Sequence, residues 1–153
     1  MKKLLLFVAV AAIAFSLNSC SNSSSDGTSI GGKIVFKIGN QNKTFDRVEV
    51  TQDVFNGGTA EEYTELTVVG TNNSSSESVS IFLNKNDLGT EAVTFFGYDD
   101  GQDLFADQND TFTINVTTNN DSKKLKGTFS GVINGPANGS PIGISNGSFD
   151  IQY

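Results

Sequence analysis

The chain has 153 residues and carries 10 basic and 17 acidic side chains, which gives a formal net charge of −7 at neutral pH. This acidic balance argues against nucleic acid as a partner, because phosphate backbones require clustered lysine and arginine. Histidine and tryptophan are absent and cysteine occurs once. Disulfide frameworks, zinc sites of cysteine and histidine, and histidine-dependent nucleophiles are therefore excluded.

The N-terminal segment has the pattern of a secretory signal. Two lysines follow the initiating methionine, residues 4–17 are apolar except for Ser16, and the chain turns polar immediately after Cys20. A charged segment followed by an apolar one is typical of exported proteins, and this apolar run is too short to be a good membrane-spanning helix.

The end of this segment, Leu17-Asn18-Ser19-Cys20, resembles the lipobox of bacterial lipoproteins. The resemblance implies a signal peptide at 1–19, a diacylglyceryl group on the sulfur of Cys20, and usually a third acyl chain, such as palmitate, on its new amino group. Several acyl chains anchor a protein stably, whereas one binds only reversibly. The residue after the cysteine, Ser21, is not the aspartate that typically retains such proteins at the inner membrane. We therefore expect an anchor in the outer membrane, with the domain facing either the periplasm or the cell surface. The alternatives are an ordinary cleaved signal and an uncleaved transmembrane anchor.

The rest of the chain divides into a tether and one domain. Residues 20–32 are rich in serine, glycine and asparagine, which predicts a lipidated flexible tether. Residues 33–153 alternate short β-type runs with turn clusters, which predicts an all-β domain. A single antiparallel β-sandwich is preferred because the runs are unequal in length, and an open or closed up-and-down barrel is the alternative. Strands are predicted at 33–38, 44–51, 63–69, 78–83, 91–98, 111–117, 124–133 and 147–153, with a short apolar piece at 104–106.

Alternation within these runs predicts the core. Within 44–51 the apolar phase changes between Phe45 and Val48, which indicates a bulge or a bend. Residues 84–89 have room for one helical turn. Gly127 and Gly131 share the inward phase of their strand, which permits curvature or close approach of another backbone. The residues predicted to face inward are Ile34, Phe36, Ile38, Val79, Ile81, Leu83, Phe112, Ile114, Val116, Leu125, Phe129, Ile133, Phe149, Ile151 and Tyr153.

The densest acidic stretch could supply oxygen ligands to a hard cation. Asp99, Asp100 and Asp103 lie close together, and further acidic and amide residues follow at 107–110. Ca²⁺ takes roughly six to eight oxygen ligands, but the spacing here does not match the EF-hand pattern. A solvated turn is the preferred interpretation, and we predict no cofactor.

Paired carboxylates could in principle hydrolyse glycosidic bonds. The candidates adjoin turns or lie on strand faces that we expect to be exposed, and a small domain with few long loops leaves little room for a cleft. We therefore expect no enzymatic activity. The carboxylates considered are Glu61, Glu62, Glu65, Glu77 and Glu91.

Aromatic residues are the remaining candidates for a binding surface. Phe95 and Phe96 are adjacent, so one faces inward and the other outward. Tyr98 shares the phase of Phe96, and these two form the candidate ligand-binding pair. Packing in the core or beneath a loop is the preferred interpretation for such aromatics.

Two short segments near the C-terminus, Gly127-Thr128-Phe129-Ser130 and Asn146-Gly147-Ser148-Phe149, carry a second resemblance. Together with the lipobox and the tether, they resemble small outer-membrane lipoproteins of Bacteroidota-type bacteria that have an uncharacterised C-terminal β-domain. That family has no established activity, so the resemblance implies a compartment and a fold class but no catalytic residues.

The sequence thus predicts a lipid-anchored protein of the cell envelope that acts as a binding or structural module at the outer membrane. Its partner would be the membrane itself through Cys20, together with a glycan, a small apolar ligand or an envelope protein. One alternative is a barrel-like carrier or sensor of a small apolar ligand, and another is a small hydrolase.

Overall fold

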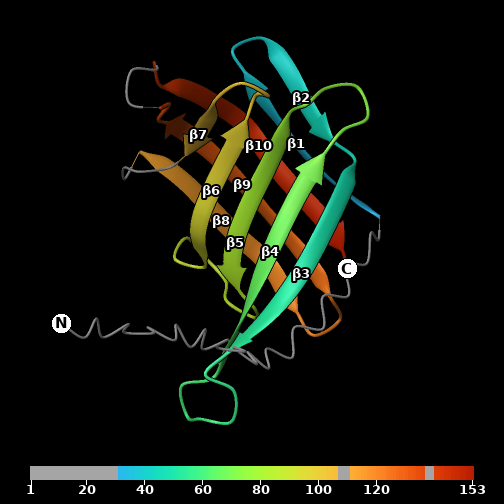
Figure 1. The fold of residues 1–153 in the computed structure, drawn as a ribbon, viewed down its shortest axis with the longest axis vertical. Coiled ribbons are helices and arrows are strands. Elements are labelled where there is room, and N and C mark those ends of the chain that lie inside the picture. The colour runs from blue at the N-terminus through green and yellow to red at the C-terminus, as the bar shows by residue number, and fades with distance from the viewer. Residues whose placement is uncertain (1–30, 107–110, 137–139) are drawn as a thin grey trace, which may run out of the picture.

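The protein is a sandwich of two antiparallel β-sheets with five strands each (Figure 1). This computed structural model describes residues 31–106, 111–136 and 140–153. The predicted signal peptide, Cys20, the predicted tether up to residue 30 and the acidic residues at 107–110 lie outside the described residues. The all-β prediction and the sandwich are confirmed, whereas the closed barrel is wrong because the two sheets share no strand. Within the described ranges, no helix is long and apolar enough to cross a membrane.

The strands of each sheet come from separate parts of the chain. Sheet A has the order β2-β1-β10-β9-β8, and sheet B has the order β3-β4-β5-β6-β7. Sheet B lies in front of sheet A in Figure 1. Sheet A contains β1 (Gly32–Ile38), β2 (Gln41–Phe45), β8 (Phe112–Asn120), β9 (Lys124–Ile133) and β10 (Ile142–Gln152). Sheet B contains β3 (Arg47–Phe55), β4 (Tyr63–Thr71), β5 (Ser78–Asn84), β6 (Val93–Asp99) and β7 (Leu104–Ala106).

The predicted run at 44–51 is in fact two strands in different sheets. Asp46 alone joins β2 to β3, so the chain passes from sheet A to sheet B at this residue. Phe45 lies on the buried face of sheet A, and Val48 and Val50 lie on the buried face of sheet B. Because the two sheets face each other, the crossing changes which residues point inward. The phase change in the sequence therefore marks a change of sheet.

The predicted helical turn at 84–89 is wrong. The segment is a turn in which Asn86 and Gly89 have φ values of 70° and 86°. The buried side-chain amide of Asn119 donates to the carbonyl oxygens of Asn84 and Asp87, at 2.8 and 3.1 Å. A side chain from β8 thus satisfies two backbone carbonyl groups of this turn.

Phenylalanine rings fill the space between the sheets. Phe36 contacts Phe129 within sheet A and Tyr98 of sheet B, with ring centroids 5.7 and 5.5 Å apart. Phe96 of sheet B lies 5.1 Å from Phe129 and 4.6 Å from Phe112. All the residues predicted to face inward are buried except Ile38, which is half-buried and packs against the core. The domain therefore has an aromatic core that spans both sheets.

Two glycines in the centre of sheet A allow two phenylalanines to lie over the neighbouring strand. Gly127 on β9 pairs with Phe149 on β10, and Gly147 on β10 pairs with Phe129 on β9. A Cβ atom added to either glycine would lie 2.3 Å from the ring opposite it. Each ring thus occupies the space that a side chain on the other strand would need. The two segments that carry the second resemblance are the two sides of this one cross-strand unit.

Short backbone bridges join the two sheets at their ends. Gly89 and Val116 exchange two N–H···O bonds of 2.9 and 3.0 Å along the outer edge of β8. Ala106 and Asn134 exchange two more of the same lengths between β7 and the end of β9. Part of the edges of β7 and β8 is therefore paired, which limits edge-to-edge association of these two strands with other chains.

The cross-strand unit predicts how strongly a single methyl group disturbs the fold. We expect Gly147→Ala to lower the free energy of unfolding by about 1–3 kcal/mol, because the added Cβ overlaps the ring of Phe129. Urea unfolding followed by circular dichroism measures the change. Gly143→Ala in the same strand is the control, because its Cβ would have nothing within 4 Å. Equal stability of the two variants would contradict this account of the core.

Candidate functional site

The two predicted ligand-binding residues lie in the core. Phe96 and Tyr98 point inward from β6 and are 1% and 2% exposed. Their rings contact other core rings, so neither presents a face to solvent. The core interpretation preferred from the sequence accounts for both positions.

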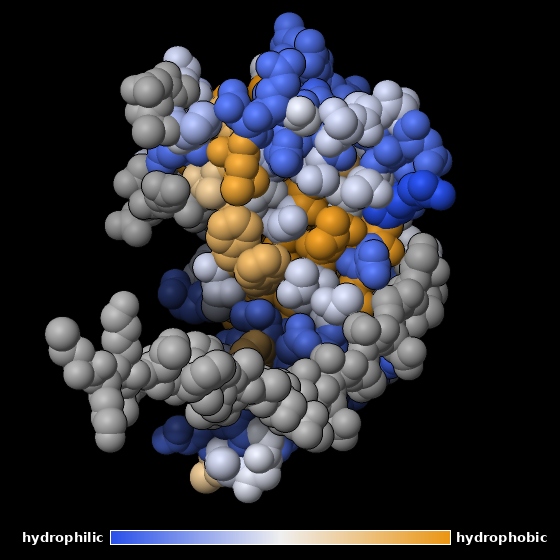
Figure 2. Space-filling model, in the orientation of Figure 1, coloured by the Kyte–Doolittle hydropathy of each residue, from blue (hydrophilic) through white to orange (hydrophobic). Residues whose placement is uncertain are grey.

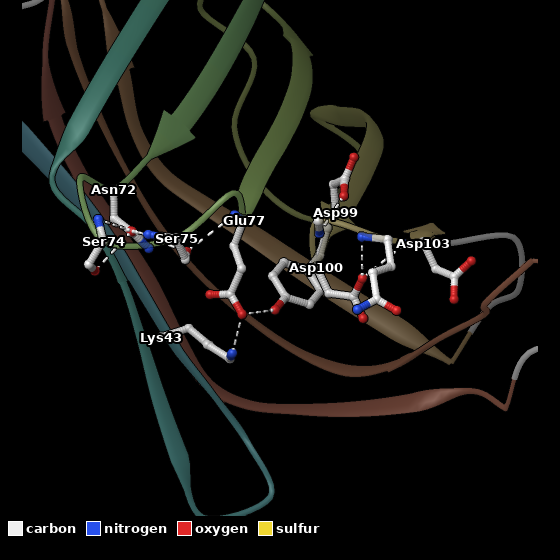
Figure 3. A network of polar contacts seen from close by, with 11 residues as sticks. Lys43, Asn72, Ser74, Ser75, Glu77, Asp99, Asp100 and Asp103 are labelled. Atoms are coloured by element: carbon white, nitrogen blue, oxygen red, sulfur yellow. Dashed lines mark hydrogen bonds and ion pairs between the residues drawn. The ribbon is translucent and has the colours of Figure 1, made fainter.

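The hydroxyl of Tyr98 belongs to a polar cluster at one end of the sandwich (Figure 3). It donates to Oε1 of Glu77 at 2.9 Å, and Nζ of Lys43 forms an ion pair with the same oxygen. Lys43 comes from β2 of sheet A, whereas Glu77 immediately precedes β5 of sheet B. Nζ of Lys43 also lies 5.9 Å from the centroid of the Tyr98 ring, within range of a cation–π interaction. The cluster therefore links the two sheets.

The protonation states in this cluster suit a structural role. Partial burial raises the pKa of Glu77, but hydrogen bonds from Lys43 and Tyr98 outweigh that effect and lower it overall. Burial and the neighbouring Glu77 carboxylate raise the pKa of Tyr98. At neutral pH the carboxylate is ionised and the phenol is protonated. A glycosidase acid needs the opposite, a carboxyl group whose pKa is raised.

The acidic loop after β6 uses its carboxylates to form turns. Oδ1 of Asp99 accepts from the backbone N–H of Gly101 at 2.7 Å. Oδ1 of Asp100 accepts from the N–H groups of Gln102 and Asp103, both at 2.9 Å, and these bonds lower the pKa of Asp100. In the part of the chain that the structure describes, no group of three or more acidic side chains is placed to hold a metal ion. The turn interpretation accounts for the geometry of this loop (Figure 3).

Among the residues that the structure describes, two small cavities are lined by residues of both sheets, and the larger measures about 260 Å³ beside Tyr98 and Phe105. The smaller cavity, of about 70 Å³, lies beside Phe96, Phe112 and Ile114. Binding pockets for small molecules usually measure roughly 300–1,000 Å³. Both cavities are therefore too small to support the carrier hypothesis.

An apolar patch lies instead on the outer face of sheet B, and Figure 2 shows it as a group of orange surfaces. The rings of Phe82 on β5 and Phe95 on β6 are a cross-strand pair with centroids 4.9 Å apart. Val69 and Leu104 extend the patch on either side, and Leu104 is 55% exposed. We call these four residues the sheet B patch.

Glycine again shapes the arrangement of these side chains. A Cβ on Gly97 would lie 2.9 Å from the Phe95 ring and 3.4 Å from a methyl carbon of Leu104. The absence of a side chain at Gly97 lets Phe95 bend along β6 towards Leu104. The apolar surface therefore continues from β6 to the edge strand β7.

Negative charge surrounds the sheet B patch. The strands of sheet B carry four carboxylates and a single cation, and their phase directs all five side chains to the outer face. An apolar centre with a charged rim is typical of a protein–protein interface. The charged residues are Arg47, Glu49, Asp53, Glu65 and Asp99.

A second exposed aromatic pair lies at the base of the β3–β4 loop. Phe55 and Tyr63 stack across the two strands with centroids 5.1 Å apart and an angle of 12° between the rings. Their exposed fractions are 41% and 43%. Figure 1 shows that this hairpin extends beyond the other strands, so the pair is separated from the sheet B patch along the same face.

Sequence reasoning named Phe96 and Tyr98 as the binding candidates and did not identify the sheet B patch. The adjacency of Phe95 and Phe96 predicts one outward ring, and the structure shows that it is Phe95. Phe82 was missed, although its phase is opposite to that of its buried neighbours Ile81 and Leu83. That phase difference was the available signal.

Searches against models of protein families, curated proteins and solved structures found no match to this chain. The resemblance to Bacteroidota-type lipoproteins therefore stays a prediction that rests on the residues quoted above. The site has to be interpreted from its own chemistry.

The Glu77 cluster predicts a specific dependence of stability on pH. The pKa of Glu77 is lower in the folded protein than in the unfolded chain. Its stabilisation is therefore complete above the unfolded value of about 4.3 and is lost as the pH falls through the folded value. We expect Glu77→Gln to lower the free energy of unfolding by about 1–3 kcal/mol at pH 7, the range for a hydrogen bond to a charged group.

Chemical unfolding of the wild type and the variant between pH 2 and pH 8 measures this dependence. The difference in stability should vanish at the acid end, where Glu77 is protonated in both states. Glu61→Gln, at an exposed loop position, is the control and should leave stability unchanged. A deficit of Glu77→Gln that is the same at every pH would contradict the ionised cluster.

Proposed function

We propose that this protein is a lipid-anchored module of the cell envelope that binds another envelope protein through the sheet B patch. The observation that carries the proposal is the continuous outward surface of Val69, Phe82, Phe95 and Leu104. Leu104 is exposed, and the other three side chains are half-buried on the outer face. A folded domain gains free energy by burying such side chains completely, so a group of them left at the surface requires an explanation. The core is already filled by other rings, which leaves this surface for a partner.

The rim defines the chemistry of that partner. All four carboxylates on this face belong to β3, β4 and β6, in the same sheet that holds the apolar residues. A partner with an apolar centre and basic residues around it would complement both features. Such complementary charges raise the rate of association and orient the two proteins.

The lipid anchor would make a weak interface sufficient. The lipobox resemblance places the anchor at Cys20, and the tether reaches the domain at β1 in sheet A. Two proteins held at the same membrane meet at a high effective concentration. The patch can therefore serve a membrane-bound partner without a large interface.

The anchor is tested by metabolic labelling with a clickable fatty acid in a bacterial host. We expect the wild type and Ser19→Ala to incorporate the label and to sediment with membranes, because both keep the cysteine thiol. Cys20→Ala should lose the label and the membrane association. Equal labelling of Cys20→Ala and the wild type would contradict the anchor.

The interface is tested by site-specific photocrosslinking in cells. A photoreactive residue at Leu104 should give one discrete protein adduct, because this side chain is 55% exposed within the patch. The matched control is Val132, which is 40% exposed on sheet A and should not give that adduct. Glu65→Lys should reduce the adduct at Leu104, because it reverses one charge of the rim. The same adduct from both positions, or no effect of Glu65→Lys, would contradict the proposal.

A further inference from the structure

A second surface of different chemistry lies on the outer face of sheet A. A hollow of about 650 Å³ opens there over the middle of β8, β9 and β10. None of its lining residues is charged, and most carry a hydroxyl or an amide group. The polar residues that matter for the argument are Thr113, Asn115, Thr128, Ser130, Asn146 and Ser148.

A β-bulge produces the hollow. The register between β10 and β9 shifts between Ile144 and Gly147, and Asn146 has a φ of 51° within that interval. Bulges bend a strand and redirect its side chains, and they are common next to binding sites. The small side chain of Ser148 follows the bulge on the outer face, which leaves space above the bent strand.

The polar side chains of the hollow are available to a ligand. Within the described residues, none of the six forms a hydrogen bond through its side chain with another residue. Two neighbouring threonines behave differently, since Thr111 donates to the carbonyl of Val132 and Thr117 donates to the carbonyl of Lys126, both at 3.3 Å. Towards the other described residues, these six hydroxyl and amide groups thus form an array of donors and acceptors without side-chain partners.

Positive charge lies beside this neutral surface, although the protein as a whole is acidic. An adjoining depression of about 280 Å³ shares Asn146 with the hollow and is lined by Lys37 and Thr44. The strands of sheet A carry four outward lysines and one carboxylate, Asp150, which is paired with Lys126. The other three outward lysines are Lys33, Lys37 and Lys124.

We propose that the outer face of sheet A binds an acidic oligosaccharide. The sugar hydroxyls would exchange hydrogen bonds with the neutral hollow, and a carboxylate of the chain would lie against Lys37 in the adjoining depression. A hydroxyl-rich ligand matches an uncharged lining of hydroxyl and amide groups, whereas a purely ionic ligand would find charge only at the margin. This site is independent of the sheet B patch, because it lies on the opposite face of the sandwich.

The probes are an oligogalacturonate and the same oligomer with its carboxylates methylated. They share every ring and ring hydroxyl and differ in charge. The full-length protein in detergent is titrated with each, and amide NMR shifts report both affinity and location. We expect the acidic oligomer to bind with a dissociation constant of about 1 mM or tighter, with shifts on β8, β9 and β10. The methylated oligomer should bind to the same strands more weakly.

Variants separate the two parts of the site. Thr128→Val removes one hydroxyl from the hollow and should weaken both probes about three- to tenfold. Lys37→Gln should weaken only the acidic probe by a similar factor of about three to ten. Thr51→Val and Lys85→Gln are the matched controls on and beside sheet B, and they should change neither affinity.

Three results would overturn the proposal. The first is the absence of binding by the acidic oligomer at 10 mM, which is about ten times the expected dissociation constant. The second is equal weakening by Lys37→Gln and Lys85→Gln, which would indicate attraction to any surface lysine. The third is binding that Thr128→Val leaves unchanged, which would exclude the hollow. None of these results bears on crosslinking from Leu104.

Discussion

The reciprocal packing of two phenylalanines against two glycines organises the centre of this protein. Phe129 lies over Gly147, and Phe149 lies over Gly127, so β9 and β10 can pair in only one register. A shift by one residue would bring a side chain into the space of each ring and would turn the phenylalanine of the shifted strand towards solvent. The same register directs Thr128 and Ser148 outward, next to each other. The aromatic core and the polar hollow are therefore two sides of one arrangement.

Much of the fold could be predicted from local patterns. The strand at 124–133 was predicted with its observed bounds, because Leu125, Phe129 and Ile133 share one phase and the glycines between them keep it. Alternation also identified the buried faces of β5, β8 and β10. The crossing at Asp46 could not be predicted, since a bulge within one strand and a change of sheet produce the same phase change. The order of strands in each sheet depends on contacts between distant segments, which no local pattern contains.

The candidate surfaces were harder to predict than the core, because they depend on how strands are placed side by side. Phe82 and Phe95 are thirteen positions apart and become one surface only through the pairing of β5 with β6. The hollow needs three strands and a bulge at Asn146. The net charge of the whole chain also did not indicate how the charges are divided between the two outer faces. Four of the five charged side chains on the strands of sheet B are carboxylates, whereas all but one of those that face outward from sheet A are lysines.

The pairing of β1 with β10 has a consequence for how the chain folds. Synthesis delivers β1 and β2 first, but the central neighbour of β1 is the eleven-residue strand at the far end of the chain. Contacts of such long sequence separation form slowly, because a large loop must close before they contribute. Sheet B, whose strands pair in simple succession, can assemble as soon as β7 has emerged. Sheet A cannot be completed before β10 is present. Until then, sheet A does not cover the apolar face of sheet B. We therefore expect a nascent chain that lacks β10 to expose the apolar face of sheet B and to depend on its surroundings for protection from aggregation.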